Sequence, residues 1–174
     1  KYTPKESDLE AIIARANKIP VFPGTQVLYL LDHEVTLVNN DGSAKRVITQ
    51  VAQATGKQGR DLLIKNHLPR SGTVKLIHAY SRRPDGTRQE ASSMRNSVIR
   101  FRGLEVGSLV VLQYVHYMRP QRFLPNHYAA SWFFQGLNRQ HAMGLWVLIT
   151  PRERRLKVVK DAGIEERVSR EGAY

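Results

Sequence analysis

The sequence contains no cysteine among its 174 residues. Disulfide bonds, thiolate metal ligands and a cysteine nucleophile are therefore excluded. It also lacks any apolar run close to the roughly 20 residues that a membrane-spanning helix needs. Acidic residues are scarce, with 15 Asp and Glu against 27 Lys and Arg, and the formal net charge is +12. Such an excess attracts anionic partners, whether nucleic acid, acidic lipid headgroups or an acidic protein surface.

Motifs for catalysis and for phosphate or metal binding are lacking as well. The sequence contains no G-x-S-x-G, G-x-G-x-x-G or G-x-x-x-x-G-K-[ST] pattern. Its 6 histidines never occur as H-x-x-x-H or H-x-H. Two carboxylate pairs, Asp32 with Glu34 and Glu165 with Glu166, are expected to be solvated surface charges. We therefore expect no catalytic residue, no metal and no cofactor in this chain.

Residues 1–24 are predicted to form a short helix and a linker. Pro4 is of the type favoured in the first turn of a helix, and Leu9, Ile12 and Ile13 follow at helical spacing. Prolines and a glycine then end the helix. The chain begins without an initiator methionine, and we expect it to be part of a larger multidomain bacterial protein.

Alternation of polar and apolar residues with a period of two predicts strands throughout residues 25–174. Residues 26–54 and 74–91 are each expected to form a hairpin, because Asn-Asp-Gly and Pro-Asp-Gly turns divide them. Residues 56–72 are predicted to be mostly loop. Residues 108–118 are apolar on both faces, as in a central strand covered on both sides.

The last third of the chain continues this pattern. It is expected to contain a crossing loop, a buried strand over residues 145–150 and a final hairpin around Leu156, Val158 and Ile164. Strands at short intervals, divided by turns, favour an all-β fold, an antiparallel β-sandwich with a short N-terminal helix.

Several of these motifs occur in an order that resembles a known family. They are found at residues 30–37, 41–43, 74–80, 83–87, 104–108 and 145–151. Over residues 25–160 the chain resembles the uncharacterised bacterial β-sandwich domain found N-terminal to transglutaminase-like domains of papain fold. The resemblance implies an immunoglobulin-like sandwich in a periplasmic, secreted or cell-envelope protein, followed by a papain-like cysteine domain. It supplies no catalytic residues.

The expected function is that of a non-catalytic accessory domain, which docks against a downstream transglutaminase-like domain or presents substrate to it. The contact is expected to use an apolar patch rimmed by arginine, with open strand edges that accept an added strand. Partner-facing residues are predicted to be the densest basic groups, although a solvated basic surface explains them equally well: Arg82, Arg83, Arg152, Arg154 and Arg155.

Three alternatives stay open. A module that binds nucleic acid or an envelope polyanion would show steep salt dependence. A carbohydrate-binding sandwich would present Trp132 or Trp146 as an exposed platform, whereas these residues, with Phe133 and Phe134, are more typical of core anchors. A hydrolase would need serine, histidine and carboxylate brought together from distant parts of the chain.

Overall fold

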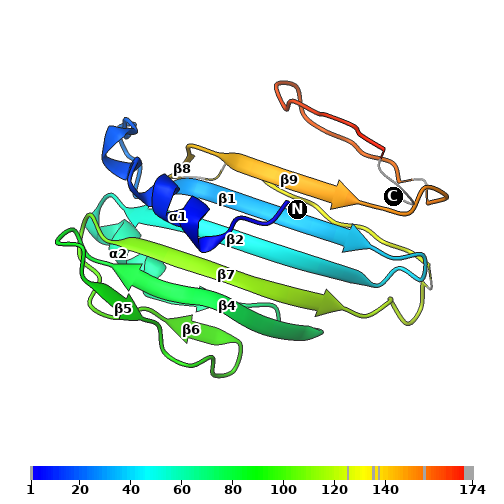
Figure 1. The fold of residues 1–174 in the computed structure, drawn as a ribbon, viewed down its shortest axis with the longest axis horizontal. Helices are drawn as coiled ribbons and strands as arrows, with labels where there is room; N and C mark the ends of the chain where they lie inside the picture. Colours follow the sequence, from blue (N-terminus) through cyan, green and yellow to red (C-terminus); the bar gives the residue numbers. More distant parts are fainter. Residues whose placement is uncertain (1, 125, 135, 137, 155, 171–174) are drawn as a thin grey trace.

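The computed structural model describes residues 2–124, 126–134, 136, 138–154 and 156–170. The chain is built mainly from strands in two sheets, with one short helix near the N-terminus, as the sequence predicts (Figure 1). The elements are α1 (Glu6–Ile13), the 3-10 helix η1 (Ala16–Lys18), β1 (Val27–Val38), β2 (Ala44–Ala54), α2 (Lys57–Leu63), β3 (Lys65–His67), β4 (Thr73–Arg82), β5 (Arg88–Glu90), β6 (Val98–Arg100), β7 (Leu109–Met118), β8 (Arg139–His141) and β9 (Gly144–Ile149).

The large sheet has the strand order β5-β4-β7-β2-β1, with β8 and β9 both pairing to the outer side of β1. The two predicted hairpins are confirmed as β1–β2 and β4–β5, both antiparallel. Their turns contain Gly42 and Gly86, whose φ angles of +83° and +88° favour glycine. The apolar strand predicted at residues 108–118 is β7, which lies between β2 and β4.

The expectation of a purely antiparallel sheet is wrong at one edge. Both β8 and β9 run parallel to β1, so the sheet is mixed. The cause is the segment of residues 119–124 and 126–134, which runs back behind the sheet before the chain enters β8 (Figure 1). A strand that follows such a crossing enters from the same end as β1, which a hairpin connection would not allow.

Two local predictions also differ from the structure. Residues 57–63, expected as loop, form α2, and its Leu63 is buried. Glycine at position 59 allows this helix to pack against β1. Any other residue would place its Cβ 1.6 Å from the carbonyl oxygen of Gln26, which is too close. The final hairpin is wrong as a pair of strands: the chain reverses at residues 161–164, but no strand is found among the described residues after β9.

The two faces of the large sheet are covered differently. On the first face, α1 places Leu9 and Ile13 in a buried cluster with residues such as Leu31, Val51 and Val111. This cluster occupies only the half of the sheet where β1 begins. On the second face, a buried cluster joins the sheet to α2 and to the small β3–β6 sheet, through Leu63, Leu68, Ile99 and Phe101.

The rest of the second face is crossed by residues 126–134. The backbone of His127 lies against Gly42, and the rings of Trp132 and Phe134 lie against Gly144. The second face is therefore covered along most of its length. Among the described residues, α1 and residues 2–4, which precede it, cover one half of the first face (Figure 1).

Candidate interaction surface

The predicted arginine groups lie at opposite ends of the large sheet. Arg82 ends β4 and forms an ion pair with Glu10 of α1, with 2.8 Å between Nη2 and Oε1. Arg83 is exposed, and its Nε donates a hydrogen bond of 3.0 Å to the carbonyl oxygen of Gly103. Both side chains therefore hold neighbouring parts of the chain in place.

The second group follows β9. The guanidinium of Arg154 donates to the carbonyl oxygens of Asn39, Asn40 and Asn126, at 2.8 to 3.0 Å. It therefore ties the β1–β2 turn to the crossing segment. Arg152 is exposed, and Arg155 lies outside the described residues. The structure does not bring the predicted arginines together into one surface.

A different surface emerges from the register of the first face. Five neighbouring strands, β9, β1, β2, β7 and β4, align their side chains in rows beyond the end of α1. One row contains Val147, Val35, Val47, Val115 and Lys75, and the next contains Ile149, Leu37, Lys45, Tyr117 and Thr73. We call these two rows, together with Leu145, the open half-face.

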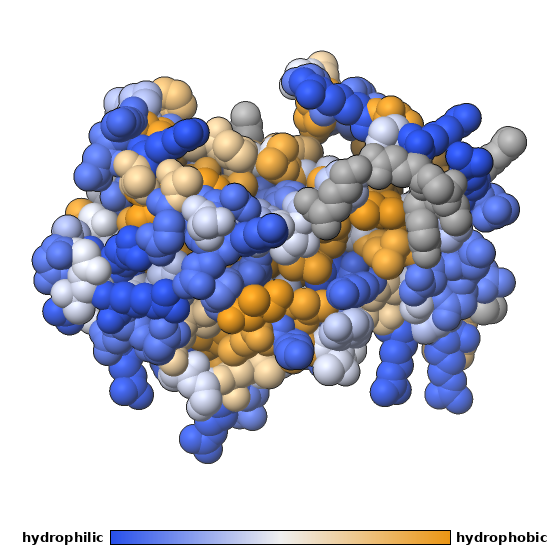
Figure 2. All heavy atoms as spheres, in the orientation of Figure 1, coloured by the Kyte–Doolittle hydropathy of each residue, from blue (hydrophilic) through white to orange (hydrophobic). Residues whose placement is uncertain are grey.

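The open half-face is apolar and partly exposed. Tyr117 and Leu145 are each 44% exposed, whereas Val35 and Val115 are buried among their neighbours. Figure 2 shows apolar side chains gathered on this side of the molecule, over the middle of the sheet and near the far ends of β1 and β9. A contiguous apolar patch on a folded domain commonly marks an interaction site.

Charge on the open half-face is of one sign. Its two ionic residues are Lys45 and Lys75, and no carboxylate occurs in it. Lys45 lies over the ring of Tyr117, with Nζ 5.8 Å from the ring centroid. The surface therefore offers an apolar strip with cationic margins.

Of the two carboxylate pairs that were expected to be solvated, Glu165 and Glu166 are exposed as expected, whereas the expectation is wrong for Asp32 and Glu34, which lie on the second face. Glu34 is only 3% exposed, and Asp32 is half-buried. The guanidinium of Arg46 donates to both carboxylate oxygens of Glu34, with the Nε bond at 2.8 Å. The hydroxyl of Thr36 donates to the same carboxylate at 2.6 Å. Glu34 is thus a paired, buried anion rather than a surface charge.

Asp32 lies beside His141 of β8. Its Oδ2 is 3.6 Å from Nδ1 of His141, and its Oδ1 accepts a hydrogen bond from Gln50 at 3.0 Å. The ring of His141 stacks on Tyr29, with centroids 4.7 Å apart. Burial raises the pKa of Asp32 and lowers the pKa of His141, so both charged forms are disfavoured.

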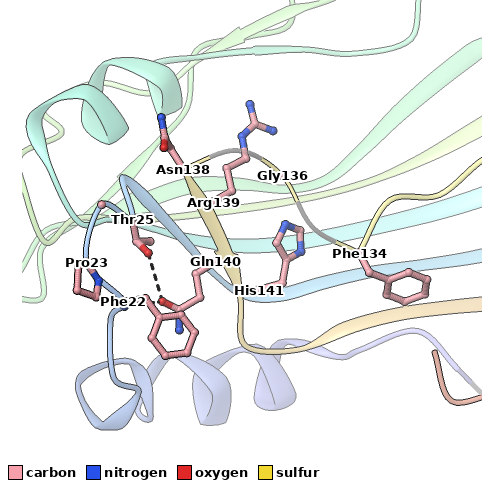
Figure 3. A pocket seen from close by; sticks show the side chains of 10 residues that line it. Phe22, Pro23, Thr25, Phe134, Gly136, Asn138, Arg139, Gln140 and His141 are labelled. Atoms are coloured by element: carbon pink, nitrogen blue, oxygen red, sulfur yellow. Dashed lines mark hydrogen bonds between the residues drawn. The ribbon is translucent and has the colours of Figure 1, made fainter. Parts of the chain in front are cut away.

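An open cleft of about 400 Å³ runs along β8 next to this pair (Figure 3). Gln140 accepts hydrogen bonds from the backbone of Phe22 and from the Thr25 hydroxyl, which fixes the loop before β1 as one wall. Arg139 and His141 leave β8 on the side opposite to Gln140 (Figure 3).

The described residues of this cleft do not form the arrangement that nucleophilic catalysis requires. Among the described residues, no serine or threonine hydroxyl bonds to His141, and its Nδ1 has no hydrogen-bond partner. Thr25, whose hydroxyl lines the cleft, donates to Gln140. A histidine–carboxylate pair without a hydroxyl can bind or buffer a proton, but it does not form the triad of a hydrolase.

The structure also places the candidate metal ligands and aromatic residues. In the described part of the chain, no group of three or more His, Asp or Glu side chains is arranged to hold a metal ion. Trp132 and Trp146 are half-buried, and Trp132 packs edge-to-face on Phe134. Phe133, expected as a core anchor, is instead 77% exposed. No described helix has the length and apolar character to cross a bilayer.

Comparisons with known proteins add little. No protein-family model matches the chain, and no curated protein matches it. A crystal structure of a candidate protease from Parabacteroides distasonis ATCC 8503 is similar at 17% sequence identity and a TM-score of 0.45. The similarity covers 55% of this chain and 24% of that protein, so the chain spans about a quarter of its length. A likeness at this level does not establish a shared fold or activity.

Proposed function

We propose that this chain is a non-catalytic interaction domain that docks an acidic partner surface onto its open half-face. The observation that carries the proposal is the pair of rows of mainly apolar side chains on four adjacent strands, β9, β1, β2 and β7, that no described helix or sheet covers. The opposite face of the same strands is covered by residues 126–134. Leaving an apolar half-face exposed costs solvation free energy, which a docked partner would recover.

The charge of the surface defines the partner. Lys45 and Lys75 lie at the margins of the open half-face, which contains no carboxylate. The whole chain carries a formal net charge of +12. A partner with an apolar centre and acidic margins complements it. The proposed partner is a neighbouring domain of the same protein, of transglutaminase-like type, in a bacterial cell-envelope setting. We also propose that the fold itself is an immunoglobulin-like sandwich, in which a second layer covers the large sheet.

A binding experiment tests this function. The polypeptide encoded after residue 174 of the complete reading frame is produced separately and titrated against this chain by calorimetry. We expect binding that Val47→Glu weakens at least tenfold, because the substitution places a carboxylate in the apolar centre. Val106→Glu is the matched control, since Val106 is 52% exposed in the turn before β7, at the other end of the sheet.

Three outcomes would contradict the proposal: absence of binding, equal weakening by both variants, or a reading frame that encodes no further domain. Salt dependence separates the main alternative. Docking through an apolar centre, with lysines only at its margins, should weaken only modestly between 50 and 200 mM salt, whereas binding of a polyanion through 6 to 10 phosphate contacts loses about 10³-fold or more over that range.

A further inference from the structure

The outer edge of β9 is an unpaired strand edge. β9 pairs with β1 on one side, and none of the described residues pairs with it on the other. The strand is six residues long, with the sequence GLWVLI, and contains neither a charged residue nor a proline. Natural proteins usually protect such edges with charges, prolines or very short strands.

The opposite edge of the sheet carries the usual protection. β5 is three residues long and contains Arg88 and Glu90. The part of β4 that β5 does not cover contains Lys75. Both edges belong to one sheet, so the bare edge at β9 is a local feature of that strand. An unprotected edge that persists in a folded domain is a natural acceptor for an added strand.

The register identifies the groups that an added strand would meet. The N–H of Asp32 donates to the carbonyl oxygen of Met143, at 2.9 Å. In a parallel ladder this bond turns the N–H groups of Leu145 and Val147 toward β1. The N–H and C=O groups of the alternate residues, Trp146 and Leu148, therefore point away from the sheet.

We propose that β9 accepts an extended segment of an acidic partner as an additional strand of the sheet. The inference rests on the proposed function and names the contact that anchors the partner beside the open half-face. The segment has apolar or β-branched residues at its centre, to continue the sheet, and carboxylates at its ends. The described charged residues nearest to β9 in the sequence are mostly cations: Arg139, Arg152, Glu153, Arg154 and Lys157. Lys160, further along, is paired with Glu166.

Charge also argues against a second copy of this chain as the occupant. Pairing two β9 edges would bring the cations at the ends of both strands together, and each copy carries +12. Like charges placed face to face across an interface are unfavourable. An acidic segment meets the same cations with the opposite sign.

Designed peptides test the proposal on the intact chain. The probe is Glu-Glu-Thr-Val-Thr-Val-Thr-Glu-Glu, followed by fluorescence anisotropy and by amide exchange in NMR spectra. We expect it to bind, and to slow exchange of the Trp146 and Leu148 amides while leaving those of Leu145 and Val147 unchanged. A peptide with Lys in place of Glu, and one N-methylated along both edges, should bind at least tenfold more weakly.

A pair of variants tests the backbone contact itself. Leu148→Pro removes an outward N–H without touching the bonds to β1, and Leu148→Ala loses the same side chain but keeps the N–H. We expect the proline variant to bind the acidic peptide about tenfold more weakly than the alanine variant, as the loss of one hydrogen bond implies. If the proline variant does not fold, the N-methylated peptide provides the same comparison.

Several results would overturn the inference. These are no binding of the acidic peptide, equal binding of the lysine or N-methylated peptide, protection of amides elsewhere, or a dimer that Leu148→Pro dissociates. The failure of strand addition is separate from the failure of the docking proposal. A partner whose affinity responds to Val47→Glu but not to Leu148→Pro would retain the docking function and reject the added strand.

Discussion

The buried ion pair between Glu34 and Arg46 supports a quantitative prediction. The Glu34 side chain is 4% exposed and that of Arg46 24% exposed. Arg46→Leu leaves the carboxylate buried with the Thr36 hydroxyl as its remaining side-chain donor. Breaking a buried pair costs about 3 to 5 kcal/mol, and the partial exposure of Arg46 places the expected cost near the lower end, at about 3 kcal/mol. For a chain of this length that lowers Tm by about 6 to 12 °C.

Chemical denaturation and thermal melting of four variants provide the assay. Arg152→Leu is the control, since Arg152 is exposed, and it should cost less than about 0.5 kcal/mol. Glu34→Leu combined with Arg46→Leu should be more stable than the sum of the single variants predicts, by about 2 kcal/mol or more, because no charge is then left unpaired. The reasoning is refuted if Arg46→Leu costs no more than Arg152→Leu, or if the two single effects are additive.

Three further predictions concern stability. Burial raises the pKa of Asp32, so the folded state disfavours the ionised carboxylate. Asp32→Asn should therefore raise Tm at pH 7, and this gain in Tm should shrink as the pH falls. Burial lowers the pKa of His33 from 6.5, so the unfolded chain takes up a proton before the folded chain does. Stability should fall below about pH 6.5 by up to about 1.4 kcal/mol per pH unit from this group, and His33→Gln should flatten that slope in denaturation curves; an unchanged slope would contradict the burial. Gly59→Ala should destabilise the chain by roughly 3 kcal/mol in urea unfolding although alanine favours helix, because its Cβ would collide with the Gln26 carbonyl; a neutral or stabilising effect would show that α2 sits elsewhere.

The sequence pattern predicted the first two hairpins because neighbouring residues determine each of them. Asn-Asp-Gly and Pro-Asp-Gly turns, each between alternating strands, determine both pairing and register. The direction of β9 was not predictable in this way. Its parallel pairing depends on the path of residues 126–134 behind the sheet, and nothing in the six residues of β9 records that path.

The burial of Glu34 shows the same limit. Alternation placed Asp32, Glu34 and Thr36 on one face, and the register confirms that they share it. A polar row normally indicates solvent, yet the crossing segment covers this face and Arg46 neutralises the carboxylate. The open half-face was missed for the complementary reason. Its valines and leucines looked like core, since the sequence does not reveal that α1 covers only half of the sheet.

Hydroxyl-radical footprinting of side chains tests the central claim most directly. The reactivity of Tyr117 and Leu145, both 44% exposed, is measured in this chain alone and in the product of the complete reading frame. Phe123, which is 89% exposed and lies outside the open half-face, provides the internal reference. Docking on the open half-face predicts that Tyr117 and Leu145 become several-fold less reactive while Phe123 keeps its reactivity. Equal reactivity of Tyr117 and Leu145 in the two samples would contradict the account.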